Sequence, residues 1–214
     1  MTIELVTTDG IFELDGGRFD VTNNIWLVGD DREVVVVDAA HDHAPIVDAV
    51  AGRRVSAIAL THGHNDHINA AVALAEAVDA PVWLHPDDRM LWDVVHPGRA
   101  PDRDLADGTV LVAGGAQLAV LHTPGHSPGC CCFHLAGTGG GTHGAGLLFS
   151  GDTLFCGGPG ATGRSHSDFP TIIRSIRERL LELPPETVVH TGHGESTTIG
   201  AEAPHLEDWI ARGH

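Results

Sequence analysis

Four apolar segments of this chain have the pattern of buried β-strands, and each ends in a histidine or an aspartate followed by a turn. Residues 55–60 lead into the segment 61–67, which reads Thr-His-Gly-His-Asn-Asp-His. Residues 117–121, 146–149 and 187–189 lead into turns that contain, in order, His126, Asp152 and His193. A helical segment, residues 69–78, follows the first of these turns. Because strand-to-helix loops usually carry the chemistry of α/β proteins, we expect the fold to gather these strand ends at one place.

The segment 61–67 predicts a metal site by itself. It holds three imidazoles, those of His62, His64 and His67, and the carboxylate of Asp66. Neutral imidazole and carboxylate are ligands of Zn²⁺ and of neighbouring first-row metals. Any single one of the 16 histidines is more simply structural, but chance does not readily place three of them beside an aspartate at the end of a strand. With the later histidines and Asp152, the ligands outline a dinuclear site that contains no thiolate.

In these motifs the chain resembles the metallo-β-lactamase superfamily and, within it, the short glyoxalase II-like hydrolases. The resemblance runs from the first strands past the last histidine motif and implies a single domain over residues 1–214. It implies that the first metal is bound by His62, His64 and His126. It implies that the second metal is bound by Asp66, His67 and His193, with Asp152 as a bridge between the two. The expected cofactors are two divalent ions, zinc being preferred and iron or manganese being alternatives.

The remaining pattern predicts an α/β fold in which two mixed β-sheets lie between outer helices. The resemblance identifies this arrangement as the αββα metallo-β-lactamase sandwich. Further strands are expected at residues 3–7, 25–28, 34–38, 82–84, 110–112 and 130–135. Helices are expected at residues 44–50, 69–78, 86–95, 170–183 and 204–210.

The composition narrows the possible partners. The formal charge of −17 arises from 29 acidic residues against 12 basic ones, and every basic residue is arginine. Such a surface repels polyanions, so nucleic-acid binding is not expected. The chain opens without a basic and then apolar leader, and no apolar run reaches the length of a membrane span. We therefore predict a soluble cytoplasmic protein with no membrane partner, while the sequence leaves the oligomeric state open.

The predicted chemistry is hydrolysis of a small-molecule thioester to a carboxylic acid and a free thiol. Two metal ions held close together activate a bridging hydroxide near neutral pH and polarise the carbonyl group. Asp66 is the expected catalytic residue, because it can orient this hydroxide while it binds the second metal. Thiolate is a good leaving group, which suits a site without an evident general acid. Larger glyoxalase II enzymes hold glutathione with basic and Tyr residues of a C-terminal domain. Here 21 residues follow His193 and the chain has neither Lys nor Tyr, so we expect a different thiol carrier.

Several alternatives remain open. A persulfide dioxygenase of the same superfamily would hold one iron at His62, His126 and Asp152, although the expected Asp-Phe-Gln ends here in Phe169-Pro170. A lactonase is disfavoured by the absence of Tyr, and a secreted β-lactamase by an aspartate where that branch commonly has Cys. A non-catalytic scaffold stabilised by metal is disfavoured because structural zinc sites are usually closed, four-coordinate and often rich in thiolate.

Other conspicuous residues have less definite interpretations. The three consecutive cysteines, Cys130 to Cys132, alternate along a strand and are expected to be buried small hydrophobic residues rather than metal ligands. Cys156 follows the Asp152 turn and could lie near the site. His143, in the Gly-rich loop 137–146, is expected to be exposed. Arg164 is either a contact for a substrate anion or the partner of Asp168 in a loop ion pair.

Overall fold

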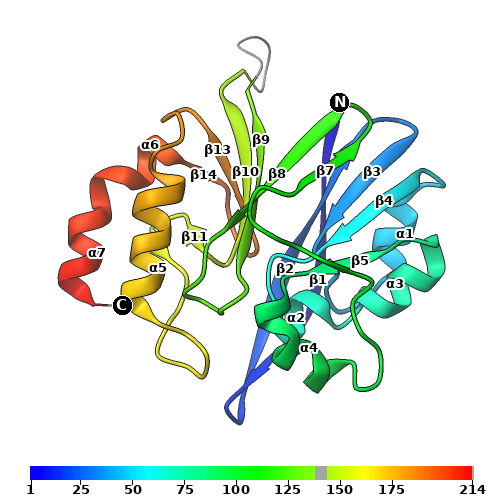
Figure 1. The fold of residues 1–214 in the computed structure, drawn as a ribbon, viewed down its shortest axis with the longest axis horizontal. Helices are drawn as coiled ribbons and strands as arrows, with labels where there is room; N and C mark the ends of the chain where they lie inside the picture. Colours follow the sequence, from blue (N-terminus) through cyan, green and yellow to red (C-terminus); the bar gives the residue numbers. More distant parts are fainter. Residues whose placement is uncertain (138–143, 214) are drawn as a thin grey trace.

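The computed structural model describes residues 1–137 and 144–213, and in it two β-sheets lie between two groups of helices (Figure 1). Helices α1 and α3 lie outside one sheet, and α5, α6 and α7 lie outside the other. This is the αββα sandwich that the sequence predicts. His143 lies outside the described residues, so the expectation that it is exposed stays a prediction.

The first sheet has the strand order β1-β2-β3-β4-β5-β6. Its first three strands pair antiparallel, and β3 to β6 pair parallel, so the sheet is mixed. The strands are β1 (Thr2–Leu14), β2 (Gly17–Gly29), β3 (Glu33–Val37), β4 (Arg54–Ala59), β5 (Val82–Leu84) and β6 (Arg103–Asp104).

The second sheet has the order β14-β13-β10-β9-β8-β7 and is also mixed, because β10 and β13 pair parallel while the other neighbours pair antiparallel. Its strands are β7 (Val110–Ala113), β8 (Ala116–His122), β9 (Cys131–Ala136), β10 (Gly146–Gly151), β13 (Val188–Thr191) and β14 (Thr197–Thr198). A small separate ribbon is formed by β11 (Leu154–Phe155) and β12 (Gly158–Pro159).

The helices are short. They are α1 (Ala44–Val50), α2 (Asn65–Ile68), α3 (Ala71–Val78), η1 (Pro86–Asp88), α4 (Arg89–Val95), α5 (Phe169–Ser175), η2 (Ile176–Leu180), α6 (Ile199–Glu202), η3 (Ala203–His205) and α7 (Leu206–Arg212). None of the helices in residues 1–137 and 144–213 combines the length and the hydropathy of a transmembrane span.

Three apolar layers hold the sandwich together. In β3, Val34 and Val36 pack with the residues of α1 and α3, whereas Val35 and Val37 face the second sheet. Burial on both faces explains why this strand reads as a continuous apolar run rather than as an alternating one. The cysteines follow the same logic, since Cys131 lies between the sheets and Cys132 lies in the outer layer with α5 and α7. Cys130, Cys131 and Cys132 are buried free thiols, as the sequence predicts.

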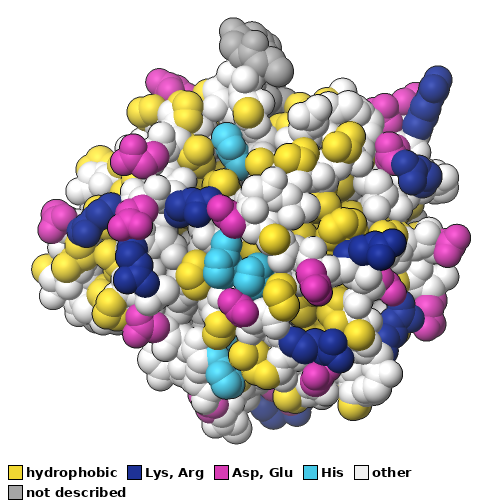
Figure 2. All heavy atoms as spheres, viewed as in Figure 1, with side chains coloured by type: hydrophobic (Ala, Val, Ile, Leu, Met, Phe, Trp, Pro, Cys, Tyr) yellow, Lys and Arg dark blue, Asp and Glu magenta, His cyan; other side chains and the backbone are white. Residues whose placement is uncertain are grey.

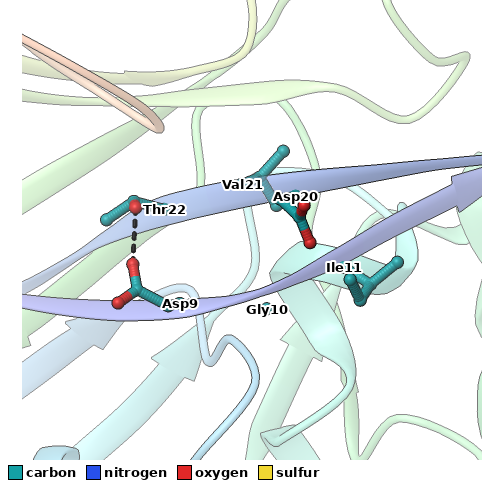
Figure 3. A pocket seen from close by; sticks show the side chains of 6 residues that line it. All are labelled: Asp9, Gly10, Ile11, Asp20, Val21 and Thr22. Atoms are coloured by element: carbon teal, nitrogen blue, oxygen red, sulfur yellow. Dashed lines mark hydrogen bonds between the residues drawn. The ribbon is translucent and has the colours of Figure 1, made fainter.

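The β1–β2 hairpin is much longer than the sequence predicts. Its two strands pair in continuous register from Thr2 with Gly29 to Leu14 with Gly17, and the ribbon projects beyond the sandwich (Figure 1). At its tip Asp15 and Gly16 have φ of 52° and 77°, which suits the tight turns of two-residue hairpins. Figure 3 shows part of this ribbon, where Thr22 Oγ1 donates to Asp9 across the strands at 2.5 Å.

The segment that follows β4 also differs from the prediction. The expected helix at residues 69–78 is observed as α3, but a separate turn of helix, α2, begins earlier at Asn65. His64 immediately before it is extended, with φ −66° and ψ 146°. The chain therefore turns between His64 and Asp66, which lets side chains from both sides of the turn face one point.

Charged side chains of both signs are dispersed over the face of the molecule that Figure 2 shows. On the face shown in Figure 2, Arg side chains lie among acidic ones, and several histidines reach the surface. No broad basic area is seen on this face, in keeping with the formal charge of −17.

Candidate metal centre

The structure brings all seven predicted ligands together. They come from the ends of strands in both sheets and from the helical turn α2, and all but His193 are buried: His62, His64, Asp66, His67, His126, Asp152 and His193. Their meeting place is therefore the common edge of the sandwich where β4, β8, β10 and β13 end.

The first group consists of His62, His64 and His126. His64 Nδ1 lies 3.0 Å from His126 Nε2. The ring of His62 stands edge-on to the other two, with centroids 4.8 and 4.9 Å away. Nitrogens that share one tetrahedral zinc at about 2.0–2.1 Å lie roughly 3.3 Å apart, so this spacing fits a common ion.

The second group consists of Asp66, His67 and His193. His67 Nε2 and His193 Nε2 are 3.2 Å apart. Asp66 Oδ2 lies 3.3 Å from His193 Nε2 and 3.6 Å from His67 Nε2. These atoms converge on a second point beside the first.

Asp152 connects the two groups. Its Oδ2 lies 3.6 Å from His126 Nε2 and 3.5 Å from His193 Nε2. Its Oδ1 lies 3.3 Å from His67 Nε2. One carboxylate thus contacts ligands of both groups, which is the geometry that a bridging ligand requires.

Unpartnered polar atoms indicate that the residues fit bound metal. Buried polar atoms normally have a hydrogen-bond partner. Among the described residues, His62 Nε2, His64 Nε2, Asp66 Oδ1 and Asp152 Oδ1 are buried without one. Cations would complete the coordination of His62 Nε2 and Asp152 Oδ1. His64 would bind through Nδ1, which faces His126, and Asp66 through Oδ2, which faces His67 and His193. The clusters fit a dinuclear site in this fold, while the role of each residue as a ligand stays a prediction.

Hydrogen bonds behind the rings fix which nitrogen faces the centre. His67 Nδ1 donates to Asp38 Oδ2 at 2.8 Å, and His126 Nδ1 donates to the carbonyl oxygen of Ala161 at 2.8 Å. His193 Nδ1 donates to the carbonyl oxygen of Thr22 at 2.8 Å. In each ring Nδ1 is thereby engaged and Nε2 faces the cluster, so Nε2 is the nitrogen that would bind a metal once it carries no proton.

Asp38 supports two ligands at once, and it was not singled out from the sequence. Besides His67, it accepts from the backbone N–H of Thr61 at 2.7 Å and from Thr61 Oγ1 at 2.9 Å. Because its proton is directed to Asp38, Thr61 Oγ1 accepts from His62 Nδ1, 3.0 Å away. The available signal was an aspartate directly after the four valines of β3.

Asp88 is a second supporting carboxylate that sequence reasoning missed. It is fully buried and accepts from Gly63 N–H at 2.7 Å, Ser127 Oγ at 2.6 Å and Gly129 N–H at 2.6 Å. Gly63 lies between two predicted ligands, and Ser127 follows His126. A Cβ at Gly63 or Gly129 would approach Asp88 to 3.0 or 2.7 Å. Asp88 therefore joins the two loops that carry the first group.

Asn23 fills the corresponding position behind the second group. It is fully buried, and its Nδ2 donates to Asp66 Oδ2 at 3.2 Å. Its Oδ1 accepts from His41 Nε2 at 2.8 Å, and Asn69 donates to His41 Nδ1 at 3.2 Å. This chain of hydrogen bonds fixes the orientation of the Asp66 carboxylate.

The two groups differ in charge. Burial lowers the pKa of His62 and His64, that of His64 to about 3, so both imidazoles are neutral. Burial alone would lower the pKa of His193, but the Asp152 carboxylate raises it to about 10. Burial would raise the pKa of Asp152, yet His67 and His193 lower it well below its usual value. The second group thus retains a proton that metal binding must displace.

A pocket of about 250 Å³ opens over the cluster. Its floor contains four predicted ligands, and its walls are Phe12, Val21, Phe155, Ala161 and Arg164. The hairpin and the loops around β11 therefore provide an apolar wall with one basic side chain. Cys156 is exposed and does not line this pocket.

A second group of potential ligands and a second hollow are less suitable for binding a metal ion. His85, Asp87 and His122 form a further group of potential ligands, but the two imidazoles stack at 4.1 Å with only 7° between their planes. Lone pairs in parallel rings do not converge on one ion. A larger hollow of about 460 Å³ lies open on the β1–β2 ribbon (Figure 3), and it is lined by two carboxylates without any histidine.

Comparisons with known proteins identify the family of the chain. Residues 18–193 match the family described as the metallo-beta-lactamase superfamily. The hydroxyacylglutathione hydrolase GloC of Haemophilus influenzae is 31% identical over 194 residues, covering 83% of this chain and 88% of GloC.

Solved structures are similar as well. TTHA1623 in a di-iron-bound form is 37% identical with a TM-score of 0.73, covering 86% of this chain and 93% of that one. The B3 metallo-beta-lactamase BLEG-1 is 31% identical with a TM-score of 0.74, covering 93% of this chain and 98% of that one.

Proposed function

Since the chain belongs to the metallo-β-lactamase superfamily of metal-dependent hydrolases, we propose that it is a glyoxalase II-like thioesterase. Its substrate would be an S-acyl conjugate of a low-molecular-weight thiol. The observation that carries this proposal is the pair of ligand groups joined by Asp152 on the floor of an apolar pocket. The similarity to a protein named hydroxyacylglutathione hydrolase supports the same reaction class.

Bound divalent ions would activate water and polarise the carbonyl group of the substrate. The chain's own residues perform the remaining tasks. Asp66 Oδ1 has no hydrogen-bond partner, so it is available to accept a proton from the attacking water and to orient it. Asn23 holds the other oxygen of the same carboxylate. Attack of water forms the new C–O bond, and the C–S bond then breaks to release a thiolate.

The residues that line the pocket suit a thiolate leaving group. Its lining offers no free carboxylic acid or imidazole, because each of these groups belongs to the ligand cluster. Thiolate leaves with little need for protonation, whereas an alkoxide or an amine requires an acid. Phe12, Val21 and Phe155 are placed to contact the apolar part of the conjugate and to exclude bulk water from it.

We propose zinc as the native metal, because a set of five imidazoles and two carboxylates suits Zn²⁺. Iron is the alternative, since the similar TTHA1623 was solved in a di-iron-bound form. Metal analysis of the protein purified without added metal distinguishes the two.

The test is a turnover assay of metal-loaded protein on a panel of thioesters, with the released thiol as the readout. We expect hydrolysis by the wild type and none by His62→Ala. The matched control is His205→Ala, which removes a histidine that is 58% exposed at the start of α7 and should leave the rate unchanged. Absence of turnover across the panel would contradict the proposal. One iron per chain with O₂ uptake on a thiol persulfide would instead identify a persulfide dioxygenase.

A further inference from the structure

Two segments that are distant in the sequence are joined by hydrogen bonds at Ser165, the residue next to Arg164 of the pocket lining. Ser165, in the loop between β12 and α5, donates through its backbone N–H and its Oγ to the Asp15 carboxylate at 2.9 and 2.6 Å. Asp15 is at the tip of the β1–β2 hairpin. These two hydrogen bonds attach the loop to the tip of the hairpin, and the attached residue, Ser165, directly follows Arg164.

The guanidinium of Arg164 is held by two aromatic rings of the hairpin. Its central carbon lies 4.5 Å from the ring centroid of Phe19 and 5.2 Å from that of Phe12. The ring of Phe12 in turn stands edge-on to His64 at 5.4 Å. Phe12 therefore contacts both the first ligand group and the arginine, which places this cation on the wall of the pocket beside the metal centre.

No carboxylate of the described residues pairs with this guanidinium. Asp168, the alternative partner expected from the sequence, instead caps α5 by accepting from the Thr171 N–H at 2.9 Å. Asp15 accepts two hydrogen bonds from Ser165 and attracts the Arg164 guanidinium without forming an ion pair with it. Elsewhere in this acidic chain, arginines bind carboxylates directly, as Arg53 does with Glu4 and Arg179 with Asp107. Arg164 is half-buried in the pocket with its planar set of donors unused within residues 1–137 and 144–213.

We propose that Arg164 binds a carboxylate carried by the substrate, so that the enzyme selects anionic thioesters over neutral ones. This inference rests on the proposed thioesterase function. A guanidinium presents parallel N–H donors that match both oxygens of a carboxylate, and stacking on the rings orients it at little entropic cost. It is the one arginine in the lining of the pocket described over the metal centre, and the sequence has no lysine. The carboxylate can belong to the thiol part or to the acyl part of the conjugate.

The experiment compares matched substrates. The acetyl thioesters of 3-mercaptopropionate and of 3-mercaptopropionamide differ only in charge on the thiol side. The adipoyl thioester of N-acetylcysteamine and its terminal amide differ in the same way on the acyl side. Arg164→Gln should raise KM about ten- to hundredfold for the carboxylate member of one pair, with kcat and the amide member unchanged. The pair that responds identifies which part carries the anion.

Two further variants separate a specific role from general damage. Phe19→Leu keeps the charge but removes one stacking face, and Phe19 is not part of the pocket lining, so an intermediate rise in KM is expected. Arg174→Gln removes an exposed arginine of α5 and should change nothing. An equal rise in KM for the acid and the amide of both pairs, or no rise at all, overturns the proposal.

Binding gives a readout that does not depend on turnover. Titration calorimetry with 3-(methylthio)propionate and its amide measures the preference for the anion directly. The wild type should prefer the acid, and Arg164→Gln should lose that preference. If the preference is found without thioester hydrolysis, the thioesterase proposal fails while the anion site stands. If hydrolysis is found but neither charge pair nor the titration distinguishes the variants, the anion site is wrong.

Discussion

Asp88→Asn tests how the ligand loops are held in place. The wild-type carboxylate accepts three hydrogen bonds in a fully buried position, from the two backbone amides of Gly63 and Gly129 and from Ser127. Asparagine retains one acceptor oxygen but places an amide N–H₂ where a second acceptor stood. If its oxygen serves Gly63 and Ser127, the Gly129 N–H faces another donor.

The expected loss of stability follows from these hydrogen bonds. Hydrogen bonds to a charged group contribute about 1.5–3 kcal/mol, and a buried donor left without a partner costs about 1–3 kcal/mol. We therefore expect the free energy of unfolding to fall by about 2–4 kcal/mol. Metal affinity should fall about tenfold or more, because both loops of the first ligand group lose a common support.

Urea unfolding of the chelated protein measures the stability without a contribution from metal. Competition with a chromophoric chelator measures the metal affinity separately. The control is Asp93→Asn, which removes an exposed carboxylate on α4 that pairs with Arg89 and should cost only about 0.3–0.5 kcal/mol. A loss below about 1 kcal/mol together with unchanged metal affinity would refute the reasoning.

Three further predictions concern the same centre. Asp38→Asn should weaken metal binding by about 10–100-fold. Asparagine keeps only one acceptor oxygen, so it cannot accept all the hydrogen bonds that orient His67 and, through Thr61, His62. A chelator competition assay that shows wild-type affinity would contradict this. Metal affinity should rise with pH between about pH 6 and pH 9. The reason is that His193, which has a pKa of about 10 before metal binds, must lose its proton to become a ligand. A metal affinity that does not depend on pH would argue against the protonated state assigned to His193. Removal of the metal by a chelator should abolish activity and lower Tm. The circular dichroism spectrum of the folded protein should persist, because the three apolar layers do not depend on the metal ligands. Loss of that spectrum would instead indicate a scaffold that needs metal to fold.

The fold class and the meeting of the candidate ligands could be predicted because both depend on local signals, whereas the division of these residues into two groups followed from the family resemblance. A buried strand such as β3 shows its apolar residues within a few positions, and each ligand motif directly follows such a strand. The outer half of the β1–β2 hairpin was missed because its strands are partly exposed on both faces and lack a hydrophobic pattern. Asp15-Gly16 was the available signal for its turn.

The supporting residues could not be predicted for a different reason. Asp88 acts through partners that are 25 and 41 positions away, and Asn23 through one that is 43 positions away. A single buried carboxylate or amide has no local pattern, so only the folded arrangement reveals what it contacts. The position of Arg164 could not be predicted for the same reason. The sequence left open a loop ion pair with Asp168 or a place in the pocket. The structure decides between them, because Asp168 caps a helix and the rings of the hairpin hold the guanidinium.

The most direct test is the number and position of metal ions in protein purified without added metal, measured by elemental analysis and by anomalous diffraction. We predict two ions per chain on either side of Asp152, one among His62, His64 and His126 and one among Asp66, His67 and His193. A single ion, or ions bound outside these seven side chains, would contradict the account.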